Sequence, residues 1–293
     1  MTTQARTIRE VTIRTAKPED ASVCGRICYE AFTQINVGHG FPPDFPSPDA
    51  PTGVLSMMFS HPCFYTVVAE FQAKIVGSNC LDERTPIAGV GPITVDPSVQ
   101  NQTIGRRLMQ AVLDRAAEKR FAGVRLLQAA FHNRSLSLYA KLGFDMREFM
   151  SVMQGPPINK TPQGYRVRPA ASSDLEDCNR VCTLVHGHDR GGELIDGIKQ
   201  GTAVVAERAG RITAYASAIG FFGHAVGETN PDLQALIASA VAFLGSGIIV
   251  PTRNAELFRW CLQSGLKVVE PMALMTTGLY NEPRGAYLPS VLY

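Results

Sequence analysis

The sequence predicts a mixed α+β protein built from two copies of one unit, and three observations support this fold class. A strand, a helix and a second strand follow one another between Pro92 and Ala130. The stretch Ile13–Cys28 aligns without gaps on Val167–Cys182. Residues 156–164, rich in proline, separate the copies as a linker should. With 293 residues and 45% hydrophobic content, the chain can form two domains with cores of their own.

The first helix is predicted to begin at Pro18-Glu19-Asp20, because proline and acidic residues favour a first helical turn. Cys24, Ile27, Cys28 and Ala31 then recur at i, i+3, i+4 and i+7, which indicates a buried stripe. The second copy repeats this stripe. We interpret the cysteines as small core residues, because no histidine or further cysteine recurs at metal spacing. No metal site is therefore predicted, and a reducing cytoplasm is the natural compartment.

Between this helix and the strand at Tyr65 lies a long insertion, residues 34–62, which contains several prolines and the side chains His39, Phe41, Asp44, Phe45 and Asp49. The composition indicates a stiff and partly aromatic segment. It fits either an ordinary surface loop or one wall of a binding site.

The segment from residue 92 to 130 carries the most information. Pro92–Val95 is predicted to be a short strand, Asp96-Pro97-Ser98 breaks it, and Gln100–Arg107 opens a helix. The apolar residues of this helix lie on one face. Val124–Ala130 forms the next strand. Because a helix joins the two strands, we expect them to pair in parallel.

The start of this helix is predicted to bind an anion. The N–H groups from Gln102 to Arg106 have no partner within the helix and lie at the positive end of its dipole. Arg106 and Arg107 add positive charge, and Gly105 allows a ligand to approach closely. A helix capped by solvent, with a basic first turn, is the alternative interpretation.

These residues resemble a known family. The order is a strand, then Gln100-Asn101-Gln102-Thr103-Ile104-Gly105, a helix, a strand, Asn133, and Leu138-Tyr139-Ala140-Lys141-Leu142-Gly143-Phe144. It is similar to the GNAT acyltransferases, a superfamily of acyl-CoA-dependent N-acetyltransferases. The resemblance implies two tandem acyl-CoA N-acyltransferase folds, each a twisted mixed sheet flanked by helices. It also implies acetyl-CoA as co-substrate, and a small-molecule or peptide amine as acceptor.

The resemblance also assigns the site residues. Cofactor contacts fall on Ile93, Thr94, Val95, Gln100, Asn101, Gln102, Thr103, Ile104, Gly105, Arg106 and Asn133. In the family, backbone groups of the strand hold the pantetheine arm and the acyl carbonyl. Thr103 departs from the pattern, because the family usually has a glycine there. A side chain at this position crowds the approach of an anion to the backbone, so cofactor affinity depends on it.

Tyr139 is the predicted catalytic residue. A phenol with a pKa near ~10 stays protonated at pH 7 and can protonate a thiolate whose conjugate acid has a pKa near ~8.5. In the family, the tyrosine at this position has that role. The alternative is a packing residue of an amphipathic helix, beside Leu138 and Leu142.

The acceptor ammonium must lose a proton, and four side chains are candidate bases: Asp82, Glu83, His39 and His61. Direct loss of the proton to water is a further route. In the resembling family the insertion at 34–62 forms a wall of the acceptor site. Residues Gly278–Tyr293 resemble the tail of tandem GNAT proteins, and in some of those proteins the terminal carboxylate reaches the N-terminal active site as a base. The resemblance implies that role for the carboxylate of Tyr293, and a strand that closes the domain is the alternative.

The internal repeat sets the domain boundaries. Identical residue pairs are Arg14/Arg168, Ala16/Ala170, Asp20/Asp174, Cys24/Cys178, Arg26/Arg180 and Cys28/Cys182. Val67-Val68-Ala69-Glu70 recurs as Val204-Val205-Ala206-Glu207, and Leu142-Gly143-Phe144 has an echo in Ser264-Gly265-Leu266. We therefore expect an N-terminal domain at 1–155, a linker at 156–164 and a C-terminal domain at 165–293.

The two copies differ in their predicted chemistry. Where the first has its phosphate loop, the second has residues 227–235, without arginine and with Glu228 and Asp232. These carboxylates satisfy the helix dipole internally and repel an anionic cofactor. Asn254 and Trp260 stand roughly where the first copy has Asn133 and Tyr139. We expect the N-terminal copy alone to bind the cofactor.

Composition excludes several function classes. A net charge of +2 offers no broad basic surface for nucleic acid or anionic membrane. The uncharged stretch 233–250 divides at Gly245-Ser246-Gly247 into a predicted helix, Leu233–Leu244, and a strand, Gly247–Val250, so it is not a spanning helix. Met1–Arg6 lacks the apolar core of a signal peptide. A monomer and a homodimer are both compatible with the sequence.

Two function classes remain. The first is an enzyme that transfers an acetyl or other small acyl group from acyl-CoA to an amine, with Tyr139 as general acid. The second is a noncatalytic module that binds acyl-CoA and reports it through the C-terminal copy.

Overall fold

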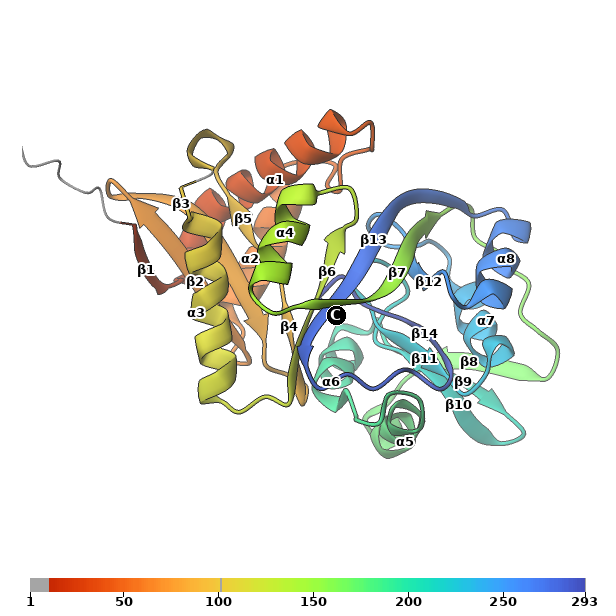
Figure 1. The fold of residues 1–293 in the computed structure, drawn as a ribbon. Coiled ribbons are helices and arrows are strands. Elements are labelled where there is room, and N and C mark those ends of the chain that lie inside the picture. Colours follow the sequence, from red (N-terminus) through yellow and green to blue (C-terminus); the bar gives the residue numbers. More distant parts are fainter. Residues whose placement is uncertain (1–10, 101, 293) are drawn as a thin grey trace, which may run out of the picture.

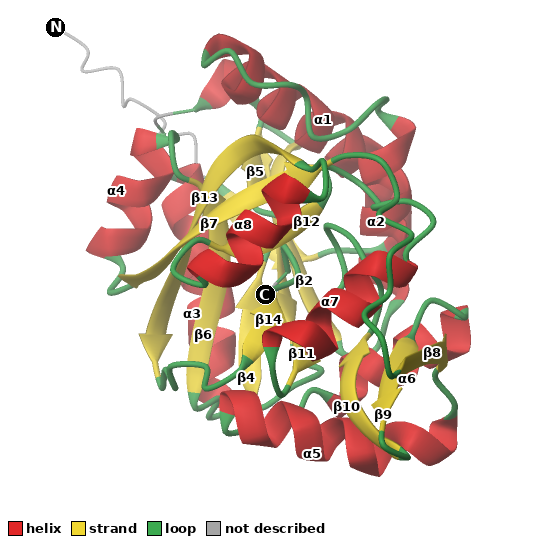
Figure 2. Ribbon diagram, turned by 90° about the vertical axis from the view of Figure 1, so that its right-hand side faces the viewer, coloured by secondary structure: helices red, strands yellow, loops and turns green. Residues whose placement is uncertain are grey.

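The computed structural model describes residues 11–100 and 102–292, and this part of the chain forms two β-sheets covered by helices (Figures 1 and 2). The larger sheet has the strand order β1 (Thr12–Thr15), β2 (Phe64–Phe71), β3 (Lys74–Asp82), β4 (Ile87–Val90), β6 (Gly123–Ala129), β13 (Lys267–Gly278), β7 (Asp145–Gln154) and β12 (Ile248–Pro251), with β5 (Thr94–Val95) paired to β3. The smaller sheet has the order β14 (Ala286–Leu288), β11 (Ala225–Gly227), β10 (Arg211–Ala216), β9 (Val204–Arg208) and β8 (Tyr165–Pro169).

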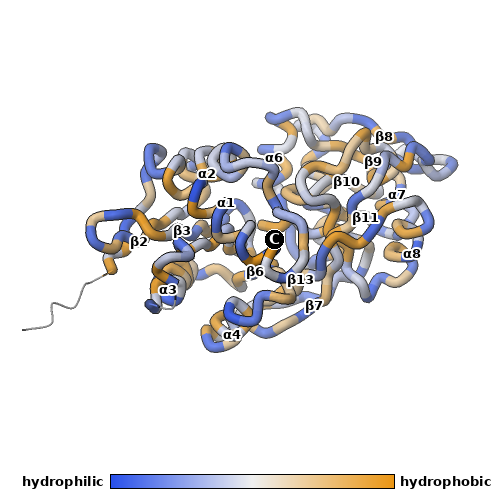
Figure 3. The backbone as a smooth tube through the Cα atoms, turned by 90° about the horizontal axis from the view of Figure 1, so that it is seen from above, coloured by the Kyte–Doolittle hydropathy of each residue, from blue (hydrophilic) through white to orange (hydrophobic). Residues whose placement is uncertain are grey.

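Helices cover both faces of the first half of the larger sheet. They are α1 (Ala21–Gly38), α2 (Asp49–Ser60), α3 (Ile104–Glu118) and α4 (Asn133–Lys141). In Figure 3, α1 and α2 lie on one side of β2 and β3, and α3 and α4 lie on the other. Successive side chains of β2 point to opposite faces of the sheet, so Val67 packs with α3 whereas Val68 packs with α1 and α2.

The second half repeats this arrangement around the smaller sheet. Its helices are α5 (Leu175–His186), α6 (Gly191–Gln200), α7 (Asn230–Ser239) and α8 (Ala255–Gln263). Val205 and Tyr215 pack with α5, whereas Ala206, Ala214 and Ala216 pack with α7. Successive side chains of a strand point to opposite faces of the sheet, and helices bury both faces here. The mixed α+β fold class is confirmed, with helices on both faces of mixed sheets.

The two halves exchange strands. β13, the last long strand of the second half, lies between β6 and β7 of the first half, with Met275 opposite Leu126 and Met272 opposite Met150. β7 in turn lies between β13 and β12, both from the second half. Figure 1 shows β13 in blue running between β6 and β7. The halves therefore share one continuous sheet, and the chain beyond residue 165 completes the sheet of the first half.

The internal repeat of the sequence corresponds to a repeated ion-pair network. In the first half, Arg14 Nε lies 2.9 Å from Glu70 Oε1, and Arg14 Nη1 lies 2.6 Å from Asp20 Oδ2. The second half has the same network, with both distances 2.7 Å, in Arg168, Glu207 and Asp174. Asp20 and Asp174 also accept a backbone N–H three residues earlier, so each arginine fixes the same turn before a helix.

Further repeated features agree with the alignment. The four cysteines of the two predicted stripes are fully buried, as expected of packing residues: Cys24, Cys28, Cys178 and Cys182. Gly143 and Gly265 follow α4 and α8, with φ of 89° and 94°, and each leads into a strand. These positive φ values explain why glycine recurs at both positions.

Several predicted boundaries differ from the structure. The insertion at 34–62 is largely helical, because α1 continues to Gly38 and α2 fills much of the rest. The helix predicted at Leu233–Leu244 ends at Ser239, because the backbone of Leu244 bonds instead to Ile219 and Phe221. Within the described residues no helix is both long and apolar enough to cross a membrane. Met1–Arg6, Asn101 and Tyr293 lie outside the described residues.

Candidate active site

A cavity opens where two parallel strands separate. β4 and β6 pair in parallel over three residues, from Ile87 opposite Gly123 to Gly89 opposite Arg125. The strand predicted at Pro92–Val95 is therefore not the parallel partner of β6, because that partner is the preceding strand Ile87–Val90. Beyond Gly89 the chain continues into β5, which pairs with β3 instead of β6. The cavity, of about 550 Å³, is lined by residues 90–95 on one side and 126–129 on the other.

Helix α3 begins at the wall of this cavity. Its first residues, Ile104, Gly105 and Arg106, line the cavity together with Thr103. The first helical hydrogen bond runs from Arg107 N to Thr103 O, so the three preceding amides have no partner within the helix. Their N–H groups lie at the positive end of a helix of 15 residues, which favours an anion.

Thr103 adopts the left-handed conformation, with φ of 63° and ψ of 1°, and its side chain makes no capping hydrogen bond. A β-branched residue is strained there, whereas glycine is not. The positive φ thus explains why glycine suits this position, and a threonine there lowers the free energy of unfolding.

Three arginines lie at or near the helix start, and they differ in orientation. Arg106 lines the cavity. Arg107, which the sequence placed beside the anion, instead donates a hydrogen bond to the Val11 carbonyl. Arg134 of α4, which sequence reasoning missed, lines the cavity and donates to Gln100 Oε1 at 2.8 Å. The cationic side chains of the cavity wall are therefore Arg106 and Arg134 among the described residues.

Two buried polar side chains of the wall have no hydrogen-bond partner among the described residues. They are the Thr94 hydroxyl, on β5, and the Gln128 amide, on β6. A buried polar group without a partner costs free energy, so a ligand with amide groups would satisfy both.

Tyr139 lines the cavity and packs in the core at the same time. It is 6% exposed, and burial raises the pKa of its phenol to about 12, opposed by a hydrogen bond with Ser135. The Ser135 hydroxyl also lies 2.6 Å from Nδ1 of His132, whose pKa burial lowers to about 4. The phenol is therefore protonated and the imidazole neutral at pH 7.

The structure brings most of the sequence-predicted site residues together. Those that line the cavity are Ile93, Thr94, Val95, Gln100, Thr103, Ile104, Gly105, Arg106 and Tyr139. Gln102 and Asn133 are not part of the wall, although Asn133 begins α4. Asn101 lies outside the described residues. Most of the site residues predicted from one segment of the sequence therefore form one wall of a single cavity.

Of the four candidate bases, three are engaged elsewhere. Asp82 forms an ion pair with Arg84 at 2.6 Å, Glu83 pairs with Arg115 at 2.7 Å, and His61 Nε2 lies 3.2 Å from Asp196. None of them lines the cavity. His39 does line it, and its ring contacts Phe131.

Two carboxyl groups that the sequence did not single out as bases face each other in the cavity wall. Asp44 lies in the loop between α1 and α2, and Glu270 lies on β13. Both carboxyls line the cavity, and burial raises the pKa of Asp44 to about 6 and that of Glu270 to about 8. A single acidic residue in the apolar strand 267–278 was the signal available in the sequence.

The second copy has a different helix start. Asp232, in the first turn of α7, is fully buried and accepts hydrogen bonds from Thr229, Tyr165 and Arg208. Glu228 forms ion pairs with Arg180 and Arg211. The carboxylates therefore lie where the sequence placed them, and Asp232 supplies the negative charge that this helix dipole favours.

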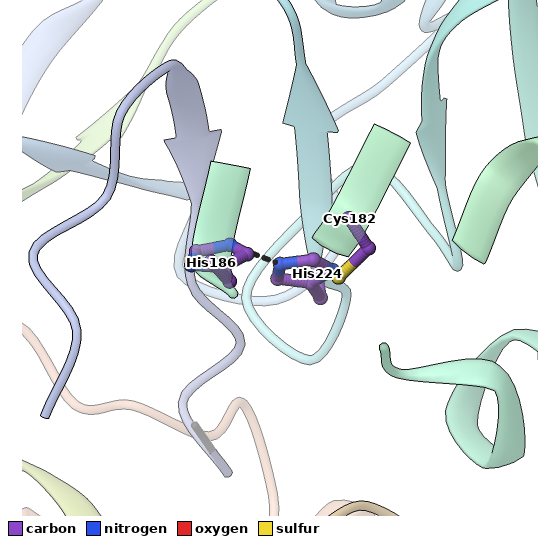
Figure 4. A group of neighbouring side chains, drawn as sticks. All are labelled: Cys182, His186 and His224. Atoms are coloured by element: carbon purple, nitrogen blue, oxygen red, sulfur yellow. Dashed lines mark hydrogen bonds between the residues drawn. The ribbon is translucent and has the colours of Figure 1, made fainter. Parts of the chain in front are cut away.

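A buried polar cluster also distinguishes the second half. Cys182, His186 and His224 place their potential ligand atoms within 4.8 Å of one another, and the two Nε2 atoms lie 3.1 Å apart (Figure 4). Burial lowers the pKa of both imidazoles far below the usual value, helped by Arg190, and raises the pKa of the thiol to about 11. A protonated thiol and a nearby guanidinium disfavour a cation, so we interpret the group as neutral imidazoles joined by one N–H···N bond.

Comparison with known proteins agrees with this geometry. Residues 31–144 match the model of the Acetyltransferase (GNAT) family. These residues contain α3, α4 and the separating strands β4 and β6, and thus the part of the cavity wall formed by residues 90–106 and 126–139. Curated protein sequences give no match to the chain.

Solved structures extend the likeness to the second half. A Pyrococcus horikoshii protein classed provisionally as an acetyltransferase matches 98% of this chain and 97% of its own, with a TM-score of 0.74 and 16% identity. A GCN5-related N-acetyltransferase from Sphaerobacter thermophilus matches 93% and 96%, with a TM-score of 0.60 and 15% identity. At these identities the likeness concerns the fold, and it covers both halves.

Proposed function

We propose, from the premise that residues 31–144 belong to the GNAT acetyltransferase family, that this protein transfers an acetyl group from acetyl-CoA to an amine, with Tyr139 as general acid. The family uses acetyl-CoA as donor. The observation that carries the proposal is one cavity that joins the unpaired amides of α3, the separated strands and the Tyr139 phenol.

The residues of the cavity fit each part of the donor. The diphosphate would lie against the amides of Ile104, Gly105 and Arg106, where the helix dipole and Arg106 favour negative charge. The pantetheine arm carries amide groups, which would satisfy Thr94 and Gln128. Backbone groups between residues 93 and 95 would hold the thioester carbonyl.

The transfer requires one proton for the departing sulfur. The amine attacks the acyl carbon, a C–N bond forms, and the C–S bond breaks while Tyr139 donates its proton to the thiolate. A phenol with a pKa of about 12 is a weak acid, but burial also raises the basicity of a thiolate formed beside it. The hydrogen bond with Ser135 opposes the rise in the phenol's pKa and so assists the donation.

We assign this reaction to the first half alone. In the second half, Asp232 occupies the start of the corresponding helix, and α8 carries Cys261 four residues before Gly265, where α4 carries Tyr139 four residues before Gly143. A carboxylate at the helix start repels the diphosphate, and this position of α8 has no phenol to act as an acid.

Replacing Tyr139 with phenylalanine tests the mechanism. We expect kcat to fall about 10²–10⁴-fold, the usual contribution of a general acid, while the Kd for acetyl-CoA stays unchanged. Release of free thiol measures turnover, and calorimetric titration measures binding. Tyr29→Phe, on α1 and outside the cavity wall, is the matched control. Unchanged turnover in Tyr139→Phe would remove this residue from the mechanism.

The noncatalytic alternative predicts a different outcome for the unmodified protein. A sensor would bind acetyl-CoA with one site per chain and release no thiol with any amine. An enzyme releases one thiol for each acetylated amine.

A further inference from the structure

The loop that carries Asp44 is held in place by Asn36. The Asn36 side chain is 1% exposed, and its Nδ2 donates to the Pro42 carbonyl at 3.1 Å and to Asp44 Oδ1 at 3.0 Å. The Ser246 hydroxyl of the second half donates to the Asp44 carbonyl at 3.4 Å. Asp44 is therefore positioned by contacts from both halves.

Glu270 is positioned by the strand exchange. It is 3% exposed and lies on β13 opposite Val152, next to a register shift between Val268 and Glu270. A β-bulge of this kind redirects a side chain out of the regular alternation. The carboxyl reaches the cavity of the first half because β13 lies between β6 and β7.

The two carboxyls differ in their affinity for a proton. Burial raises the pKa of Asp44 to about 6, and burial together with repulsion by Asp44 raises the pKa of Glu270 to about 8. A pair of this kind carries one negative charge and holds one proton. It can exchange that proton for one positively charged group.

The wall around the pair is apolar and comes from several elements. Residues of this part are Phe32, Phe45, Phe222, Met272, Val291 and Leu292. The rings of Phe32 and Phe45 meet edge to face, with centroids 6.2 Å apart. Val291 packs against core residues of both halves, and Leu292 packs in the core of the first half. Among the described residues, the arginines of the wall are Arg106 and Arg134, which belong to the start of α3 and to α4.

We propose that Asp44 and Glu270 bind the ammonium of the acceptor, and that the acceptor is a hydrophobic amine without a carboxylate beside its nitrogen. This inference rests on the proposed acetyl transfer. The charge of the pair complements one ammonium, and the aromatic and aliphatic wall complements an apolar body. An α-amino acid would bring its carboxylate against the pair, where like charges repel.

The protons balance in this arrangement. When the ammonium binds, the proton held by the pair leaves to solvent and both carboxylates face the cation. One ammonium proton then passes to the pair, which returns to its original state and leaves a neutral amine. The amine attacks the acyl carbon, and the surplus proton of the new amide nitrogen replaces the one that Tyr139 gave to sulfur.

The experiment uses the full-length protein saturated with CoA and a panel of amines: 2-phenylethylamine, tryptamine, hexylamine and cyclohexylmethylamine. Calorimetry at pH 7 in two buffers of different ionisation enthalpy measures affinity and the protons released. We expect at least one amine of the panel to bind with release of about one proton, as displacement of the pair's proton by a cation requires. Phenylalanine, which adds a carboxylate to 2-phenylethylamine, should bind at least about tenfold more weakly than that amine.

Variants separate a binding role from a structural one. In Glu270→Gln we expect weaker amine binding and loss of the proton release, with the Kd for acetyl-CoA unchanged. Asp145→Asn, whose side chain is 70% exposed, is the control. Other ionisable groups line the cavity: Cys28, His39, Arg106, His132, Arg134 and Tyr139. Because burial keeps Cys28 and Tyr139 protonated and His132 neutral, we repeat the measurement in His39→Gln to exclude the remaining histidine.

Three results would overturn the inference. They are no binding by any amine of the panel, tighter binding of phenylalanine than of 2-phenylethylamine, and full proton release in Glu270→Gln. Each of these leaves the proposed acetyl transfer in place if acetyl-CoA binds and thiol is released with another acceptor. A protein that does not bind acetyl-CoA at all contradicts both proposals.

Discussion

The first turns of α3 and α7 occupy corresponding positions in the two halves and carry opposite charges. The third residue of α3 is Arg106, whereas the third residue of α7 is Asp232. Arg106 lines an open cavity, and Asp232 is fully buried among its own hydrogen-bond donors. The dipole of α3 therefore faces the cavity, whereas that of α7 is neutralised by a buried carboxylate. The backbone before the two helices differs as well, because Thr103 is left-handed and Thr229 is extended.

A second difference lies two helices earlier, on α1 and α5. His186 follows Cys182 on α5 by four residues, as Phe32 follows Cys28 on α1. Phe32 lines the cavity of the first half, whereas His186 meets His224 in a buried cluster. Corresponding positions on α1 and α5 thus line a cavity in the first half and a closed polar cluster in the second.

The largest effect is expected from separating the two halves. A fragment of residues 1–155 lacks β13, so β6 and β7 lose the strand between them and expose unpaired edges. We expect this fragment to aggregate without a cooperative unfolding transition, as measured by circular dichroism and light scattering. Coexpression with residues 156–293 should restore a soluble complex. A stable, monomeric fragment 1–155 would show that the halves are independent domains.

Reversing the charge at the start of α3 should give the first copy the acidic helix start of the second. In Arg106→Asp we expect the Kd for acetyl-CoA to rise about 100-fold or more, because a charge-assisted contact is lost and a repulsive one is gained. The free energy of unfolding should not fall, since an acidic residue at a helix start is favourable. Arg106→Gln, which removes the cation alone, should raise the Kd less. Equal effects of Asp and Gln would mean that the helix start does not face the diphosphate.

The histidine pair should make the second half sensitive to acid. The pKa of each buried imidazole is lower in the folded state than its unfolded value near ~6.5, so the unfolded state binds more protons below that pH. Stability should therefore be retained above pH 7 and lost as the pH falls below about 6.5, by up to about 1.4 kcal/mol per pH unit for each group.

Denaturant unfolding between pH 7.5 and 5 measures this slope. The double variant His186→Leu/His224→Leu should flatten it, because both partners are replaced by apolar groups. His39→Gln, an exposed histidine, is the control. Asp20 and Asp174, whose pKa their arginines lower, contribute at more acidic pH, below the unfolded value of ~3.9. An unchanged slope in the double variant would contradict the assignment.

The smallest effect is expected at Thr103. Its left-handed backbone costs roughly 1–2 kcal/mol for a residue with a side chain, whereas the extra freedom of glycine in the unfolded chain costs roughly 0.5–1 kcal/mol. Thr103→Gly should therefore raise the free energy of unfolding by about 0.5–1 kcal/mol and lower the Kd for acetyl-CoA a few-fold. Thermal unfolding and calorimetry test both. A weaker Kd in the glycine variant would show that the threonine side chain contacts the cofactor.

Local patterns were sufficient for the first wall of the cavity. Residues 92 to 139 form it within one strand–helix–strand–helix segment, so spacing along the chain fixes which side chains meet. Spacing along the chain could not rank the candidate bases for the acceptor ammonium. Glu83 and His61 look available in the sequence, but they pair with Arg115 and Asp196, which folding brings close; Asp82 pairs with Arg84, two residues away.

The sequence by itself determined the fold class, the internal repeat and the helix start that faces the cavity. Each of these depends on residues close together in the chain or on short patterns that recur in both halves. The tertiary structure alone decided the exchange of β7 and β13, the meeting of Asp44 with Glu270, and the meeting of His186 with His224. Such pairs depend on strand order and register, which no local pattern specifies, because many pairings of similar apolar strands bury similar surface.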